Sequence, residues 1–242
     1  MLLKLKERGL GTPKLVITVL LFLSALLSLI PVVTGEGDAF SYIYCFITAL
    51  FVLLPPVLTL LLRWEMHFGF YLVFSLYTMG PLLGAVYKLY YVTSWWDILL
   101  HALAGFLFAV VGAHLATALN KGREPSYALA IVFGLLVSLG VAALWEFFEY
   151  GADIVLGSDM QTDTVIHSFV TKLGGVDGGV VRYEGIADTL VNGQSLGQGG
   201  YIDIGLIDTM SDMLYEAIGA IGYAVYALFD RGRHPLIKLL KR

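Results

Sequence analysis

The sequence predicts an all-α fold, a polytopic membrane helix bundle with six transmembrane helices and a long Gly-rich outer loop between helices five and six. Of the 242 residues, 58% are hydrophobic and 14% are charged, and the mean hydropathy is +0.79. Soluble domains carry about 25% charged residues. Six runs are apolar over the roughly 20 residues that a bilayer requires. They are Leu15–Val33, Ser41–Leu62, Phe68–Tyr90, Ile98–Leu119, Tyr127–Tyr150 and Ile204–Phe229. Residues 1–242 therefore form a single integral membrane domain in this interpretation.

Composition also excludes several classes of protein. The net charge of −4 argues against nucleic acid as a partner. Cys45 is the single cysteine, so an internal disulfide is impossible. Basic residues precede the first apolar run as they do in a signal peptide, but this run is too long for one and lacks a small-residue cleavage site. We therefore expect a retained first helix. The sequence does not predict an oligomeric state.

The basic residues orient the chain in the cell membrane. If the N-terminus is cytoplasmic, 12 of the 15 Lys and Arg residues lie on the cytoplasmic side, and an even number of helices returns the C-terminus to that side. Both termini are therefore expected in the cytoplasm. Most acidic residues, 15 of 19, fall in the outer loops or the outer ends of helices.

Prolines and small residues predict details of the helices. Pro55-Pro56 and Gly80-Pro81 predict kinks in helices two and three, because proline removes a backbone donor. Small residues favour close helix contacts. Those expected to make them are Gly105, Ala109, Gly134, Gly219 and Gly222.

The extracytoplasmic loop 151–203 holds 11 of the 27 glycines. We expect a short helix near Thr164–Leu173 and then flexible chain. A loop of this length is usually functional or mobile, so it is a candidate lid over the outer mouth of the bundle. The alternative is an insertion without a role.

Ionisable residues in the predicted helices come in pairs, and such residues are costly in a membrane and often functional. Their spacings of three or four residues place the members of each pair on one helix face. All three pairs fall in the outer third of the membrane, given a rise of about 1.5 Å per residue. The pairs are Asp97 with His101, Glu146 with Glu149, and Asp208 with Asp212.

Five carboxylates and one imidazole at one depth predict a site for a divalent metal ion whose identity the sequence leaves open. All six residues are candidate ligands, and Glu149 and His101 are also candidate general bases. Asp153 and His167 follow helix five and could reach the same place. The alternative is a structural polar seam, in which the acids hydrogen-bond helix ends and loop.

These motifs resemble the YjdF-like bacterial inner-membrane proteins, a family of unknown function. The resemblance covers about residues 90–225. It rests on Asp97-ILL-His101-ALA-Gly105-Phe106, Trp145-Glu146-FF-Glu149-Tyr150, Asp208-Thr209-MS-Asp212-Met213, Gly219-Ala220 and Asp159-Met160-Gln161. The stretch 171–200 looks like a Gly-rich insertion that typical members lack. The resemblance implies one site from the three pairs, but no reaction.

Three functions are compatible with these observations. The first is a metal-dependent hydrolase or transferase that acts on a membrane lipid or a lipid-linked substrate. The second is a non-catalytic membrane protein with a polar seam. The third is a cation transporter, against which the scarcity of acids in the inner halves of the helices argues.

Overall fold

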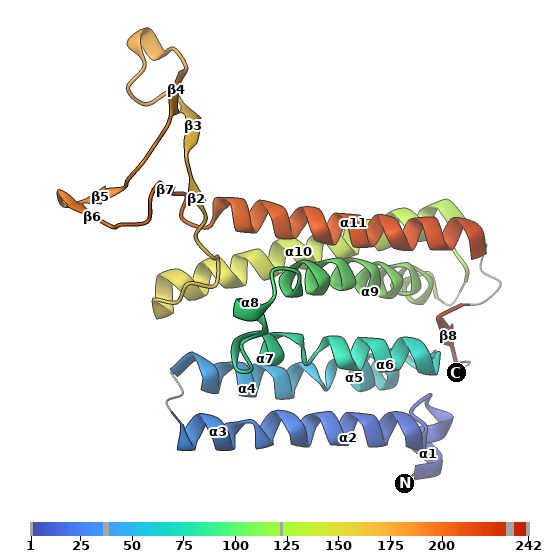
Figure 1. Ribbon diagram of the computed structural model, residues 1–242. Coiled ribbons are helices and arrows are strands. Elements are labelled where there is room, and N and C mark those ends of the chain that lie inside the picture. Colours follow the sequence, from blue (N-terminus) through green and yellow to red (C-terminus); the bar gives the residue numbers. More distant parts are fainter. Residues whose placement is uncertain (1, 36–38, 122, 231–234, 241–242) are drawn as a thin grey trace. The chain divides into compact units, whose positions relative to one another are not determined.

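The computed structural model describes residues 2–35, 39–121, 123–230 and 235–240 (Figure 1). Helices dominate it, as predicted. The chain divides into two compact units, one formed by residues 1–143 with 213–242 and the other by residues 144–212. We describe each unit by itself.

The first unit holds most of the helices. Its elements are α1 (Leu2–Glu7), α2 (Thr12–Leu27), α3 (Leu29–Thr34), α4 (Ala39–Phe51), α5 (Leu54–Leu62), β1 (Trp64–Met66), α6 (Phe68–Tyr77), α7 (Gly80–Ala85), α8 (Leu89–Val92), α9 (Trp96–Leu119) and β8 (Ile237–Leu239), with the first part of α10 (Tyr127–Leu156) and the later part of α11 (Leu206–Asp230). Its buried core centres on large side chains such as Trp64, Tyr71 and Phe74.

Within the described residues, four helical segments are long and apolar enough to cross a membrane. They are Thr12–Thr34, Ser41–Leu62, Trp96–Leu119 and Tyr127–Leu156. The predicted third helix is divided into α6, α7 and α8, and α6 alone is only 10 residues long. The predicted sixth, α11, has 25 residues but carries acids in its first turns. The structure thus supports several membrane-spanning helices, while the count of six is not confirmed.

The predicted proline breaks are confirmed. Both α5 and α7 have proline within their first two positions. Helix α4 ends at Phe51, before Pro55-Pro56, and α6 ends at Tyr77, before Gly80-Pro81. A proline fits the first turn of a helix, where its missing N–H has no partner to lose, so each run restarts at this point.

Glycines bring α9, α10 and α11 close together in the first unit. A Cβ atom at Gly105 or Gly219 would lie 1.9 Å from a carbonyl oxygen of the facing helix, and one at Gly134 would lie 2.5 Å from the Ala109 oxygen. The predicted contacts at these positions are confirmed. The prediction for Gly222 is wrong, because a Cβ there would meet no atom within 4 Å among the described residues.

The second unit contains the last part of α10, the first part of α11 and the loop between them. The loop forms β2 (Val165–Ile166), β3 (Ser168–Thr171), the 3-10 turn η1 (Val176–Gly178), β4 (Val181–Glu184), β5 (Leu190–Val191), β6 (Gln194–Ser195) and β7 (Tyr201–Ile202). Antiparallel pairs join β2 with β7, β3 with β4, and β5 with β6. Figure 1 shows β3 with β4 and β5 with β6 as hairpins, and β2 beside β7.

The expected helix near Thr164–Leu173 is therefore wrong. Residues 164–171 are mostly β-branched or aromatic, and such side chains favour strands. The Phe169 ring also stacks on the rings of Tyr183 and Tyr201, at centroid distances of 5.3 and 4.9 Å. These cross-strand contacts stabilise β structure in a segment where we expected a helix followed by unstructured chain.

Candidate functional site

Three carboxylates gather in the second unit. Glu146, Glu149 and Asp212 each offer an oxygen atom, and these atoms lie within 4.8 Å of one another. All three residues are buried, with exposed fractions of 5%, 7% and 4%. The three-residue spacing on α10 places the two glutamates on one helix face, and Asp212 comes from the start of α11.

Like charges at this separation repel strongly. At an effective dielectric constant of about 20, two unit charges less than 4.8 Å apart repel by at least about 3 kcal/mol. Burial raises the cost of charge further. Bound cations or protons would relieve this repulsion, so the cluster has the chemistry of a cation or proton site.

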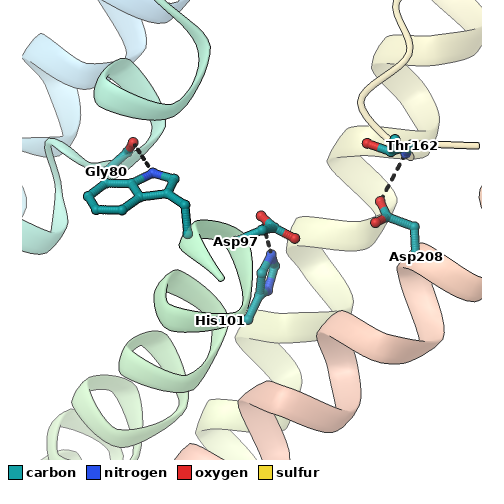
Figure 2. Close-up of polar contacts among 6 residues, drawn as sticks. Gly80, Asp97, His101, Thr162 and Asp208 are labelled. Carbon is teal, nitrogen blue, oxygen red and sulfur yellow. Dashed lines mark hydrogen bonds and ion pairs between the residues drawn. The ribbon is translucent and has the colours of Figure 1, made fainter. Parts of the chain in front are cut away.

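Asp208 holds the loop. Its Oδ2 atom accepts a hydrogen bond of 2.9 Å from the backbone N–H of Thr162 (Figure 2). The adjacent Gln161 donates a side-chain hydrogen bond to the hydroxyl of Thr209. These contacts tie the Asp159-Met160-Gln161 run to the first turn of α11. Asp208 therefore anchors the loop to α11, a role that the sequence did not indicate for this residue individually.

Asp153 shapes the turn after α10. Its carboxylate accepts hydrogen bonds from the Ser158 hydroxyl at 2.7 Å and from the backbone N–H groups of Met160 and Gln161 at 2.6 and 2.9 Å. One carboxylate thus satisfies three donors of the turn. These contacts are those of a loop-forming residue, and the hypothesis that Asp153 is a metal ligand stays a prediction.

His167, the other loop residue considered as a ligand, also contacts the loop. Its Nδ1 atom is hydrogen-bonded to the backbone carbonyl of Ile186 at 3.1 Å, and the residue is exposed. Nearby, burial raises the pKa of the Asp159 carboxyl above its usual value, and the charges of Asp163 and Asp153 raise it further. The surroundings of Asp159 in the turn after α10 therefore favour the protonated form of its carboxyl.

Asp97 and His101 lie in the first unit, on α9. The Asp97 Oδ1 and His101 Nε2 atoms are 3.6 Å apart (Figure 2), which is longer than a hydrogen bond. His101 is only 9% exposed, and Asp97 lies in the first turn of the helix, where a negative charge is favoured by the helix dipole. The approach of this pair to the carboxylates of the second unit stays a prediction.

The sequence reasoning missed Glu216. This residue follows Asp212 by one helical turn and is 2% exposed, which makes it one of the most deeply buried acids of the chain. Its backbone carbonyl faces Gly105 across a close helix contact. The signal was present, since Asp208, Asp212 and Glu216 repeat every four residues and so share one helix face.

The comparisons with known proteins identify the family. The chain matches the family described as "Predicted membrane protein (DUF2238)" over residues 15–233, and the resemblance to YjdF-like proteins is consistent with this match. No curated protein and no solved structure matched the chain. The family match covers most of the chain and includes all three acidic pairs, and on this ground the chain belongs to the DUF2238 family of predicted membrane proteins, whose function is unknown.

Proposed function

We propose that this membrane protein binds a divalent metal ion through Glu146, Glu149 and Asp212. The observation that carries the proposal is the placing of three buried carboxylates with oxygen atoms within 4.8 Å of one another. Hard divalent cations such as magnesium, manganese and calcium prefer oxygen ligands. One such ion would offset most of the negative charge that the three side chains bring together.

The separation of the oxygens is compatible with such an ion. Metal–oxygen distances are about 2.0–2.6 Å for magnesium and calcium. Ligands at right angles are then about 3–3.7 Å apart, and ligands on opposite sides of the ion about 4–5 Å apart. The limit of 4.8 Å falls within this range, so small side-chain movements would suffice to complete the coordination.

A metal at this place would suit hydrolysis or group transfer on a lipid or lipid-linked substrate. The sequence places the acids in the outer third of the membrane, near the headgroups. A bound ion would polarise a phosphoryl or acyl oxygen of the substrate and lower the pKa of a bound water. His101, or Glu149 through the oxygen that does not bind the ion, would then accept the proton of that water, and Asp97 and Asp208 would be further ligands or partners.

A second candidate is a non-catalytic membrane protein with a structural polar seam. The hydrogen bond from Thr162 to Asp208 and the contacts of Asp153 favour it, because both acids bind loop backbone. In this case Glu146, Glu149 and Asp212 would share protons instead of binding a metal.

The metal content of the purified protein distinguishes the metal site from the structural polar seam. We expect the purified protein to hold a stoichiometric divalent metal by elemental analysis and to lose it on chelation. Glu146→Gln and Asp212→Asn should lower the metal content at least tenfold, because a metal site depends on each of its few ligands. Glu184→Gln is the matched control, since that glutamate is exposed in the same unit. Metal-free wild-type protein, or equal loss in all three variants, would contradict the metal site.

The contribution of His101 is tested separately. If Asp97 and His101 complete the site, His101→Ala should weaken metal binding about 10-fold or more. Unchanged affinity in His101→Ala, with loss in Glu146→Gln, would confine the metal to the second unit.

We also propose that both termini are cytoplasmic and that the loop 151–203 lies outside the cell membrane. The 12-to-3 distribution of basic residues supports this orientation. Cysteine placed at the exposed Ser195, in a chain whose Cys45 is replaced, should react with an impermeant reagent added from outside. Reaction only from the cytoplasmic side would overturn the orientation.

A further inference from the structure

The first unit contains a large cavity at the end of the helices opposite to Asp97. Its volume is about 1440 Å³, above the range of about 300–1,000 Å³ that is usual for small-molecule sites. It is lined by the end of α5, the last turns of α9, the start of α10, the end of α11 and strand β8. Leu62, Val110 and Leu115 are among its apolar residues. The cavity shares no lining residue with the acidic site, and its proposed ligand does not depend on the proposed metal.

Polar groups of a particular kind lie among these apolar residues. Among the described residues, the cavity lining includes three basic residues, Arg63, Lys121 and Lys238, and two acids, Glu124 and Asp230. These five described residues carry a formal charge of three minus two, or +1. A single phosphodiester, which carries one negative charge, would neutralise it.

Arg63 points to a missing acceptor. Within the part of the chain that the structure describes, the Nε atom of Arg63 is buried and has no hydrogen-bond partner. Leaving a buried charged donor unsatisfied costs more than about 1–3 kcal/mol. A guanidinium binds phosphate oxygens well, because its N–H donors form a planar fork.

The lysines have one role that requires no ligand. Helices α5, α9 and α11 end beside the cavity, and basic side chains stabilise the carboxyl ends of helices. This role explains neither the volume of the cavity nor the unsatisfied Arg63 donor. Both are explained by a ligand with a phosphate and an apolar portion.

We propose that this cavity binds the headgroup region of an anionic phospholipid, with the phosphodiester near Arg63, Lys121 and Lys238 and the glycerol and first acyl carbons along the apolar lining. The positive-inside orientation places the cavity at the cytoplasmic leaflet, where basic pockets between helices bind anionic lipids.

Native mass spectrometry of the detergent-solubilised full chain tests this proposal with three probes at equal concentration. They are dioleoyl phosphatidylglycerol, dioleoylglycerol, which lacks the phosphate, and glycerol 1-phosphate, which lacks the acyl chains. We expect retention of the phosphatidylglycerol and at least tenfold lower occupancy by the other two. Equal occupancy by dioleoylglycerol would overturn the phosphate contact, and equal occupancy by glycerol 1-phosphate would overturn the assignment to a lipid.

Paired variants locate the binding. Lys121→Gln with Lys238→Gln should lower phosphatidylglycerol binding about 30-fold, since two basic residues at about 1 kcal/mol each contribute about 2 kcal/mol together. Both side chains are exposed, so the fold should be retained. Lys4→Gln with Lys6→Gln is the matched control, because it removes two exposed basic residues of the same predicted side that do not line the cavity. Equal loss in both pairs would mean general surface attraction and would overturn the cavity site.

Discussion

Replacing Glu146 by glutamine should have opposite effects on stability in the absence and in the presence of metal. The substitution keeps the size of the side chain and removes one negative charge from the cluster with Glu149 and Asp212. Without metal, it relieves repulsion between buried carboxylates, so the variant should be more stable than wild type. With metal, it removes a ligand, so the variant should be less stable.

The magnitude follows from the separations. Three carboxylates within 4.8 Å form three repelling pairs, each of at least about 3 kcal/mol at an effective dielectric constant of about 20. Neutralising Glu146 removes two of these pairs, or at least about 6 kcal/mol of repulsion. The wild-type chain can relieve this repulsion at a lower cost by binding a proton, because protonating an ordinary glutamate at pH 7 costs about 4 kcal/mol. The gain without metal is therefore limited to about 4 kcal/mol. With an ion at 100 times its Kd, the variant forfeits about 2.7 kcal/mol of the stabilisation that binding gives wild type.

Thermal unfolding in detergent, with chelator or with added divalent ion, measures both effects. Glu149→Gln should behave in the same way, and Glu184→Gln should change little in either condition, because exposed ion pairs contribute little to stability. Destabilisation by Glu146→Gln of equal size in chelator and in metal would refute the reasoning, since it would mean that the carboxylate is held by fixed hydrogen bonds.

Three further predictions concern the loop and the helix contacts. Residues 171–200 should exchange amide hydrogens earlier than the helices, because the stretch is rich in glycine and poor in buried contacts; protection equal to that of the helices would count against a lid. The raised pKa of Asp159 means that the fold favours its protonated form, so protection of the turn after α10 should fall as the pH rises through that pKa. Asp159→Asn should remove this dependence, and an unchanged profile would be inconsistent with it. Gly105→Ala should lower the melting temperature sharply, because its Cβ would lie 1.9 Å from a carbonyl oxygen, whereas Gly222→Ala meets no described atom within 4 Å and should be neutral or stabilising. Equal effects of the two substitutions would argue against the close contact.

The helices were largely predictable from the sequence, because long apolar runs and proline positions are local signals. The third predicted helix shows the limit of this reasoning. Its apolar run continues through residues 68–90, but Gly80-Pro81 divides it into separate helices that hydropathy alone cannot distinguish from a kinked one. For α11, length favoured a span, while its acids weaken the apolar character on which a span depends.

The loop was predictable in principle and was misjudged. Asn192-Gly193 lies between Val191 and Gln194, both residues have positive φ angles of 53° and 77°, and β5 pairs with β6 across them. Asn-Gly at such a position is a strong hairpin signal. The number of glycines suggested a flexible chain and so obscured this turn. Glycine also permits tight, ordered turns, because it readily adopts positive φ angles.

The acids at the end of α10 and the start of α11 have different contacts, and their spacing in the sequence does not predict which contact each one makes. Asp208 and Asp212 are one turn apart on the same helix, yet the first binds the loop backbone while the second is buried beside Glu146 and Glu149. Asp153, one turn after Glu149, satisfies three donors of the following turn. Charge counting over the pairs therefore does not separate the different roles of these acids, because a carboxylate bound to backbone N–H groups is already partly stabilised. The proposed metal site therefore rests on the smaller set of three buried carboxylates, Glu146, Glu149 and Asp212, whose oxygen atoms lie within 4.8 Å of one another.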